Sequence, residues 1–258
     1  LAAASAMGIK PGDEVIVRAY TFVASYTALL FLGAVPVLAE IDDSLTIDPE
    51  DIPHRITSRT KAIMPVHMLG NPCDMAAIME IADANGLAVL EDACQAAGGS
   101  YRGRKLGAIG RMGAFSLNIF KTITAGDGGV AVTDDPDLYE RAFGMHDQGH
   151  KPLRAGVEVG TRGILGLNFR ANELTGAVGL VQLHKIDRIL ATLREKKRKF
   201  KERVAGAGGF QFRRLNDPQG ECATLCTVLF HSSDAAAEVA QNLNTATLDE
   251  SGWHVYAN

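Results

Sequence analysis

The first two-thirds of the chain alternates short β-rich runs with helical patterns, and this alternation constrains the fold more than any other feature. Alternating strands and helices are typical of α/β proteins, in which helices cover both faces of a mostly parallel sheet. Strands are expected at 14–17, 34–40, 61–66, 87–91, 114–117 and 129–133. Helices are expected at 21–31, 74–84 and 135–143. The sequence therefore predicts an α/β fold built on a mostly parallel sheet.

The last third of the chain is organised differently. From Asn172 onward, apolar residues recur at helical spacing, and they predict one long helix that ends near Ala205. A glycine-rich break follows at 206–209, and then come a strand-like run at 224–230 and a helix at 233–242. We therefore expect a large domain over residues 1–200 and part of a smaller α+β domain over residues 201–258.

The composition is that of a globular protein and argues against nucleic-acid-binding and membrane-spanning classes. The 258 residues are 47% hydrophobic and 22% charged, as in an ordinary globular protein with a sizeable core. The net charge of −4 gives no reason to expect a nucleic-acid partner. The longest apolar stretch, 28–39, is too short to span a bilayer, and no signal peptide is visible. The four cysteines form no CxxC pair, so we expect reduced thiols, no metal site and a cytoplasmic protein.

Both ends of the sequence look like interruptions. Residues 1–8 resemble the last turns of a helix closed by a glycine, with no initiator methionine before them. Residues 253–258 break off without a recognisable terminal element. We therefore expect the chain to be a fragment of a longer protein.

One lysine stands out among the candidate functional residues. An apolar run leads to Lys121, and a glycine cluster follows it at 126–129, while Asp92 ends an upstream strand. A desolvated amine together with a carboxylate from another strand end suits Schiff-base chemistry on pyridoxal phosphate, where the acid pairs with the pyridine nitrogen. Taken singly, the lysine is typical of a solvated loop, the glycines of a turn and Asp92 of a helix N-cap. The joint pattern favours the cofactor site.

Polar side chains also follow several of the expected strands. His67 follows one strand, Asp92 ends another, and Ser116 lies near the end of a third. Ligands of parallel sheets bind beyond the carboxyl ends of the strands. The three positions therefore predict a site at that edge of the sheet.

Several segments, in order along nearly the whole chain, resemble the DegT/DnrJ/EryC1/StrS family of sugar aminotransferases, which are fold-type I pyridoxal-phosphate enzymes. The segments that carry the resemblance are 11–17, 19–25, 65–72, 91–98, 115–129 and 166–173. The resemblance implies the large domain of a fold-type I transferase followed by part of the small α+β domain. The family's phosphate-gripping Ser-Gly-Thr turn would lie before Leu1, and the end of the small domain would lie beyond Asn258.

The resemblance also implies roles for individual residues. Lys121 matches the lysine that binds the cofactor and later shuttles a proton, and Asp92 matches the acid on the pyridinium nitrogen. Gln95 matches a residue beside the phenolic oxygen, and Ser116 matches a hydroxyl contact to the phosphate. Phe22 matches the ring that stacks on the pyridine, although its spacing suits a core phenylalanine equally well.

Four further positions lie in or near the segments that carry the resemblance. Asn168 matches a residue that reaches the phosphate from a neighbouring subunit, which implies a homodimer with shared active sites. His67 stands where the family has a polar residue near the cofactor, and its alternative is a satisfied histidine at a strand end. Arg170 fits a structural salt bridge equally well, and Asp127 is interpreted as a loop residue.

The resemblance implies an aminotransferase that moves an amino group from glutamate or glutamine to a keto sugar, and we expect this sugar to be linked to a nucleotide. Sugar dehydratases that resemble this group replace the lysine by histidine, so Lys121 speaks against them. A cyclitol or aminobenzoate-type enzyme and a non-catalytic binding protein on the same fold stay open. The segment at 150–157 fits either a loop near substrate phosphates or the subunit interface, or an ordinary exposed loop.

Overall fold

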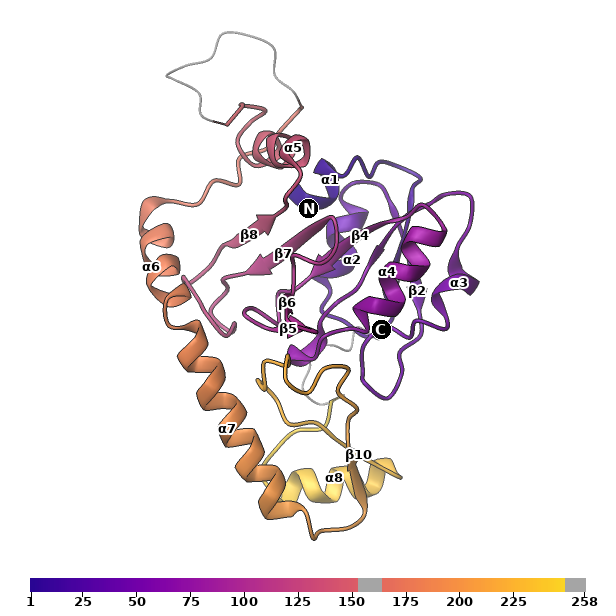
Figure 1. Cartoon of the computed structure of the whole chain (residues 1–258), viewed down its shortest axis with the longest axis vertical. Coiled ribbons are helices and arrows are strands. Elements are labelled where there is room, and N and C mark those ends of the chain that lie inside the picture. Colours follow the sequence, from indigo (N-terminus) through magenta and orange to yellow (C-terminus); the bar gives the residue numbers. More distant parts are fainter. Residues whose placement is uncertain (153–163, 249–258) are drawn as a thin grey trace.

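A six-stranded sheet forms the centre of the computed structural model, which describes residues 1–152 and 164–248 (Figure 1). The strands lie in the order β2-β1-β3-β4-β7-β8, and every neighbouring pair is parallel except β7 and β8. Their bounds are β1 Glu14–Arg18, β2 Val35–Ala39, β3 Thr60–Met64, β4 Ala88–Asp92, β7 Met112–Ser116 and β8 Gly129–Val132. The predicted mostly parallel sheet is confirmed, and each of its strands overlaps an expected run.

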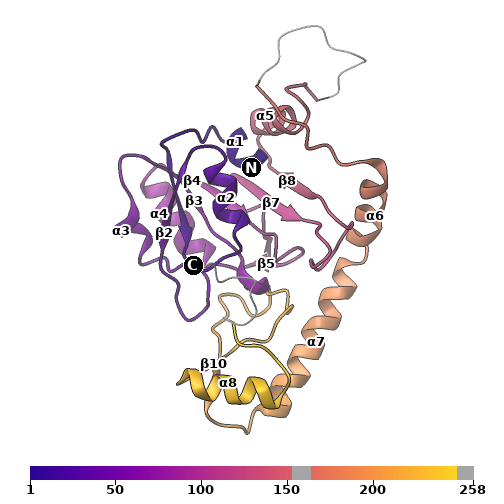
Figure 2. The ribbon, with the colours of Figure 1, turned by 180° about the vertical axis from the view of Figure 1, so that it is seen from behind.

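Helices pack on both faces of this sheet, as the chain's alternation predicts (Figure 2). Alternate residues of β1 enter different cores: Ile16 joins one hydrophobic cluster, whereas Val15 and Val17 join the other. The first cluster is covered by α3 (Ile52–Arg55), α4 (Met75–Ala84) and the start of α7 (Ile186–Val204). The second is covered by α1 (Ala2–Ala6), α2 (Ala24–Leu30) and α5 (Pro136–His146).

The predicted helix between 172 and 205 is wrong in one respect, because two helices occupy this range. α6 (Glu173–Leu183) ends before His184, and α7 begins at Ile186. None of the residues of α6 is buried, whereas Ile186 and Leu190 of α7 enter the first hydrophobic cluster. A Cβ on Gly98 would lie 2.7 Å from the Cδ1 atom of Ile186, so the absence of a side chain at Gly98 allows α7 to pack closely against the core. The turn between the helices therefore separates a helix with no buried residue from one whose first turns pack into the core.

The C-terminal part contains a two-stranded antiparallel sheet, β9 (Phe210–Phe212) and β10 (Val228–Phe230), followed by α8 (Ser233–Asn242). The helix matches its predicted bounds, and the Ser232 side chain caps it by accepting from the Ala235 amide. The expected domain boundary near residue 200 falls inside α7 and stays a prediction. Residues 249–258 lie outside the described part, as does most of the segment 150–157.

Five short elements have no counterpart among the expected ones. They are α3, β9, the two strands of the hairpin formed by β5 (Ser100–Tyr101) and β6 (Arg104–Lys105), and the 3-10 turn η1 (Met68–Gly70) that follows β3. Across residues 1–152 and 164–248, the structure has no helix with both the length and the apolar character needed to cross a membrane.

Candidate active site

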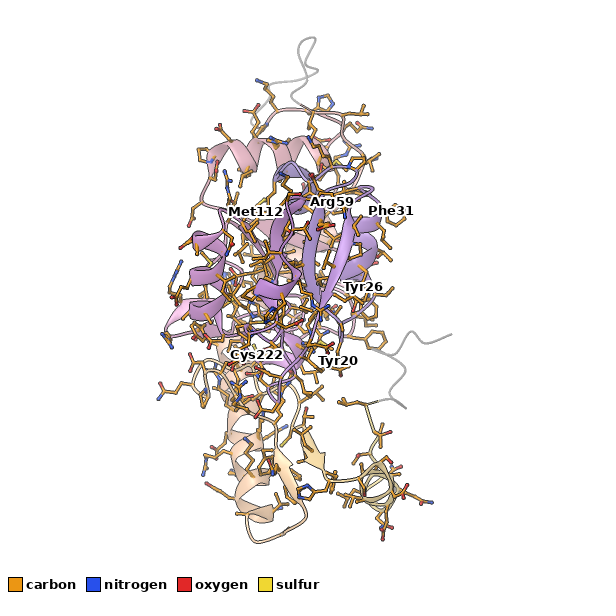
Figure 3. All side chains as sticks on the ribbon, turned by 90° about the vertical axis from the view of Figure 1, so that its right-hand side faces the viewer. Tyr20, Tyr26, Phe31, Arg59, Met112 and Cys222 are labelled. Atoms are coloured by element: carbon orange, nitrogen blue, oxygen red, sulfur yellow. The ribbon has the colours of Figure 1, made fainter. Side chains whose placement is uncertain are left out.

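The carboxyl ends of the parallel strands point toward the C-terminal part of the chain. Phe31, Arg59 and Met112, which precede or begin strands, lie at one end of the sheet, whereas Tyr20 follows β1 and lies at the other (Figure 3). Cys222, from the segment after β9, lies at the same end as Tyr20 (Figure 3). The predicted site residues at strand ends are therefore next to the segment that follows α7.

The structure brings Lys121, Phe22 and Asp92 to this edge. The Lys121 Nζ atom lies 5.8 Å from the centroid of the Phe22 ring. The start of α2, three residues after Phe22, is fixed to the end of β4, because the Ser25 hydroxyl donates to Asp92 Oδ2 at 2.7 Å. Thr21 supports this contact, with its hydroxyl 3.0 Å from that of Ser25. The ring and the amine thus meet beside a carboxylate from a different strand.

Asp92 is held at both its backbone and its side chain. Its amide donates to Pro65 O at 2.9 Å, and its carbonyl accepts from the His67 amide at 3.0 Å. The carboxylate accepts from the Ser25 hydroxyl and, at 3.1 Å, from the Cys94 amide. Ser25 was not among the predicted residues, although it lies in a segment that carries the resemblance.

Among the described residues, the side-chain amide of Gln95 is bonded to the protein through its oxygen only. Its Oε1 atom accepts from the Leu69 amide at 2.9 Å. Within the described ranges its Nε2 atom has no hydrogen-bond partner in the structure. The side chain therefore has a fixed oxygen and an available NH₂ donor.

Ser116 ends β7, and Lys121 lies in the loop that follows this strand. The Ser116 hydroxyl oxygen accepts from the Asn118 amide at 3.3 Å, which leaves its proton available to another acceptor. The Lys121 amide donates to Asn118 O at 3.0 Å, and the Leu117 amide donates to Gly128 O at 2.9 Å. These backbone bonds fix where the lysine side chain leaves the loop.

The Cys94 thiol shares the electrostatic environment of this cluster. Burial raises the pKa of Cys94 well above its ordinary value, the negative charge of Asp92 raises it further, and the positive charge of Lys121 opposes both. The thiol is therefore protonated at neutral pH and is a poor nucleophile. The thiol donates to Ala114 O at 3.7 Å.

His67 occupies a different environment from the cluster around Lys121. Its side chain is fully buried, its Nε2 lies 3.0 Å from Glu91 Oε2, and its Nδ1 accepts from the Cys73 amide at 3.1 Å. An Nδ1 that accepts carries no proton, so the ring is the neutral tautomer that donates to Glu91. Both nitrogens are engaged, which favours the satisfied strand-end histidine. A cofactor contact for His67 stays a prediction.

Asn168 lies apart from these residues on the surface. Its Oδ1 atom accepts from Arg170 Nε at 3.0 Å, and Arg170 also forms an ion pair with Asp147 at 3.4 Å. In the part of the chain that the structure describes, no hydrogen bond joins Asn168 to the other predicted site residues. Asp127 accepts from the amide of Gly128 at 2.9 Å, as the loop interpretation predicts.

The sheet, its helices and its carboxyl-edge loops together form the fold of fold-type I pyridoxal-phosphate-dependent transferases. The sequence profile of the DegT/DnrJ/EryC1/StrS aminotransferase family matches residues 1–255. The chain therefore belongs to the DegT/DnrJ/EryC1/StrS aminotransferase family.

Named relatives and solved structures agree with this assignment. The GDP-perosamine synthase of Caulobacter vibrioides is 42% identical over 202 residues, which is 78% of this chain and 51% of that protein. An aminotransferase from Psychrobacter cryohalolentis superposes with a TM-score of 0.84 at 30% identity, covering 94% of this chain and 68% of that one. NtdA from Bacillus subtilis, solved with bound cofactor PMP, superposes with a TM-score of 0.81 at 27% identity, covering 94% and 55%. The chain spans about half the length of the curated relatives it matches.

Proposed function

We propose that this chain forms the cofactor-binding part of an aminotransferase that moves an amino group from glutamate or glutamine to a keto sugar linked to a nucleotide. The observation that carries the proposal is the meeting of the Lys121 amine with the Phe22 ring beside Asp92 at the carboxyl edge of the sheet. The family and the GDP-perosamine synthase support the sugar substrate.

The groups at this edge match the chemistry of pyridoxal phosphate. Lys121 would hold the cofactor through its amine, and the fixed carboxylate of Asp92 would pair with the ring nitrogen. The NH₂ of Gln95 and the hydroxyl of Ser116 are donors, as the phenolic oxygen and the phosphate require. The ring of Phe22 offers a stacking face. Bound pyridoxal phosphate supplies an electron sink for negative charge on the carbon beside the amine.

The proton transfers fall to Lys121 in this proposal. Once its amine is free of the cofactor, Nζ takes a proton from the donor's carbon and returns one to the acceptor's. The centroid of the Phe22 ring lies 5.8 Å from Nζ, so the ring borders the amine. Asp92 keeps its place through Ser25 and the Cys94 amide, so its charge stays fixed during these transfers.

We also propose that the protein is a homodimer with shared active sites. α6 has no buried residue, and Leu174 is 78% exposed on it. The lysine loop adds Ile119 and Phe120, which are 63% and 69% exposed and directly precede Lys121. An apolar surface of this kind marks a protein interface. Its position beside the lysine loop and the segment of Asn168 supports a partner that completes the site.

A cyclitol or aminobenzoate ketone as the acceptor remains the second candidate for the reaction. Lys121, Asp92 and Gln95 would act in the same way on either acceptor, because none of them is predicted to contact the distant part of the substrate. The non-catalytic alternative is disfavoured, since a purely structural role would not require an available amine, carboxylate and amide at one edge.

The test is the visible absorption spectrum of the protein with pyridoxal phosphate, before and after addition of L-glutamate or L-glutamine. We expect a visible band that one of the two donors bleaches. Lys121→Ala should lose the band and reduce turnover by on the order of 10³-fold, because the lysine provides both the attachment and the proton transfer. Lys10→Ala, at an exposed lysine before β1, is the matched control. A wild-type protein without a band would contradict the proposal.

A further inference from the structure

Arg213 is a buried arginine whose guanidinium binds the backbone of a turn next to the candidate site. Its side chain is 3% exposed. Its Nη1 atom donates to Met68 O at 3.1 Å and its Nη2 atom to Leu69 O at 2.8 Å. The guanidinium thus joins the segment after β9 to two successive carbonyls of the η1 turn. A lysine has a single ammonium and cannot reproduce this two-pronged geometry as well.

The turn that Arg213 holds has an unfavourable backbone conformation. Leu69 has a φ of +53° and Gly70 a φ of +77°, both in the left-handed region. A leucine in this region costs free energy and persists only where its surroundings fix it. Two further contacts from the same C-terminal segment contribute: the Thr224 hydroxyl donates to Leu69 O at 3.2 Å, and the Cys222 amide donates to Gly70 O at 2.9 Å.

The amide of Leu69 is the link between this turn and the candidate site. It donates to Gln95 Oε1 at 2.9 Å, and the left-handed conformation of Leu69 sets the direction of that N–H. A side-chain amide has an oxygen and a nitrogen of nearly the same shape, so its orientation depends on its hydrogen bonds. With the oxygen fixed by Leu69, the NH₂ group is the half that remains available.

We propose that Arg213 is a positioning residue, which holds the left-handed Leu69 turn and thereby orients the Gln95 amide so that its NH₂ group faces the cofactor. This role rests on the proposed function for the identity of the ligand, whereas the chain of contacts from Arg213 to Gln95 is a property of the protein alone. The orientation of the Gln95 NH₂ group, which would donate to the phenolic oxygen of the cofactor, would then depend on the segment that carries Arg213.

The first measurement follows the Leu69 amide by hydrogen exchange in the protein without cofactor. Arg213→Met should accelerate its exchange about tenfold, since the amide loses the support of one to two hydrogen bonds to its turn. Arg213→Lys should fall between this variant and the wild type. Arg214→Met is the matched control, because the neighbouring Arg214 binds Asp42 and Asp43 at the surface. Thr224→Val provides a second, milder variant should Arg213→Met fail to fold.

The second measurement follows the bound cofactor's visible band across pH. Arg213→Met should move the midpoint in the same direction as Gln95→Leu, whereas Arg214→Met should not move it. A residue that only stabilises the fold would lower the melting temperature without shifting this midpoint.

Unchanged Leu69 exchange in both Arg213→Met and Thr224→Val would overturn the proposal. So would a midpoint that moves in Gln95→Leu but not in Arg213→Met. A wild-type protein that binds no cofactor would overturn the proposed function and the cofactor-facing role of Gln95, whereas the exchange measurement would still decide whether Arg213 holds the turn.

Discussion

Arg18 shows how a single residue departs from the rule that buried charges are paired. It ends β1 and is fully buried, and among residues 1–152 and 164–248 none of its three guanidinium nitrogens has a hydrogen-bond acceptor. Its contact is with the Tyr20 ring, whose centroid lies 4.9 Å away. Burial lowers the pKa of Arg18 to about 10, which shows that the charged form is disfavoured there.

We predict that Arg18→Met raises the free energy of unfolding by about 1–3 kcal/mol, because an uncompensated buried charge is replaced by an apolar chain of similar length. Urea denaturation at pH 7 is the measurement. Arg59→Met is the control, and it should be neutral or slightly destabilising because Arg59 pairs with Glu14 at 2.5 Å. A marked loss of stability in Arg18→Met would mean that the guanidinium is paired in solution.

Residue-scale predictions from the sequence succeeded where the residue lies at a strand end and failed where its partner is distant. Asp92 and Ser116 end the strands at which they were expected. Ser25 was missed as a partner of Asp92 because the two are 67 positions apart, and neither sequence spacing nor residue type predicts that pairing. The same reason hid the contact of His67 with Glu91, which are 24 positions apart.

At the scale of elements, Glu91 organises a loop that the sequence did not reveal. Its buried carboxylate accepts from the amides of Gly107, Ile109 and Gly110 at 2.8, 2.6 and 2.6 Å, in addition to His67. Burial favours the neutral acid, but the bonds from His67, Gly110 and Gly107 prevail and hold the pKa of Glu91 below its ordinary value. The carboxylate thus joins β4 to the loop that leads into β7.

We predict that Glu91→Gln lowers the free energy of unfolding at pH 7 by about 3 kcal/mol, because the amide's NH₂ would face N–H donors in a buried site. Since the folded-state pKa of Glu91 is depressed, its contribution is present above the unfolded-state pKa and is lost as pH falls through the folded-state pKa. Urea unfolding from pH 7 to pH 3 should show a weaker acid dependence in Glu91→Gln. Glu50→Gln, at an exposed site, should behave as the wild type.

Elements were predictable where burial gives them a strong pattern. β1 and β3 each contain three consecutive apolar residues, and α5 begins at Pro136 directly after Asp135, whose side chain caps the helix. The turn between α6 and α7 was not predictable, because it contains neither glycine nor proline and follows from the packing of Ile186 over Gly98. η1 has three residues, too few for any periodicity.

At the scale of the whole molecule, the apolar surface of α6 is the feature least explained by a single copy. Val178, Val181 and Leu183 are 47%, 53% and 53% exposed, although helices of monomers usually bury their apolar side. α6 does contact the lysine loop, since a Cβ on Gly179 would lie 3.5 Å from Leu117 Cδ1. A partner on the other side of α6 would therefore lie close to Lys121.

The proposed shared site can be tested by mixing two inactive variants in the holoenzyme. If Asn168 completes the partner's site, Lys121→Ala and Asn168→Ala should each be inactive or nearly so. A hybrid dimer would contain one site with both defects and one intact site. Random exchange at equal amounts should therefore restore about a quarter of the wild-type activity, because about half of the dimers are hybrids with one working site each. Adding Leu174→Asp and Val181→Asp to both variants should abolish the restoration by dissociating the dimer, as light scattering would show. Leu243→Asp, at the exposed residue that follows the distant α8, should not. No restoration in a mixture that light scattering shows to be dimeric would mean that each subunit carries a complete site.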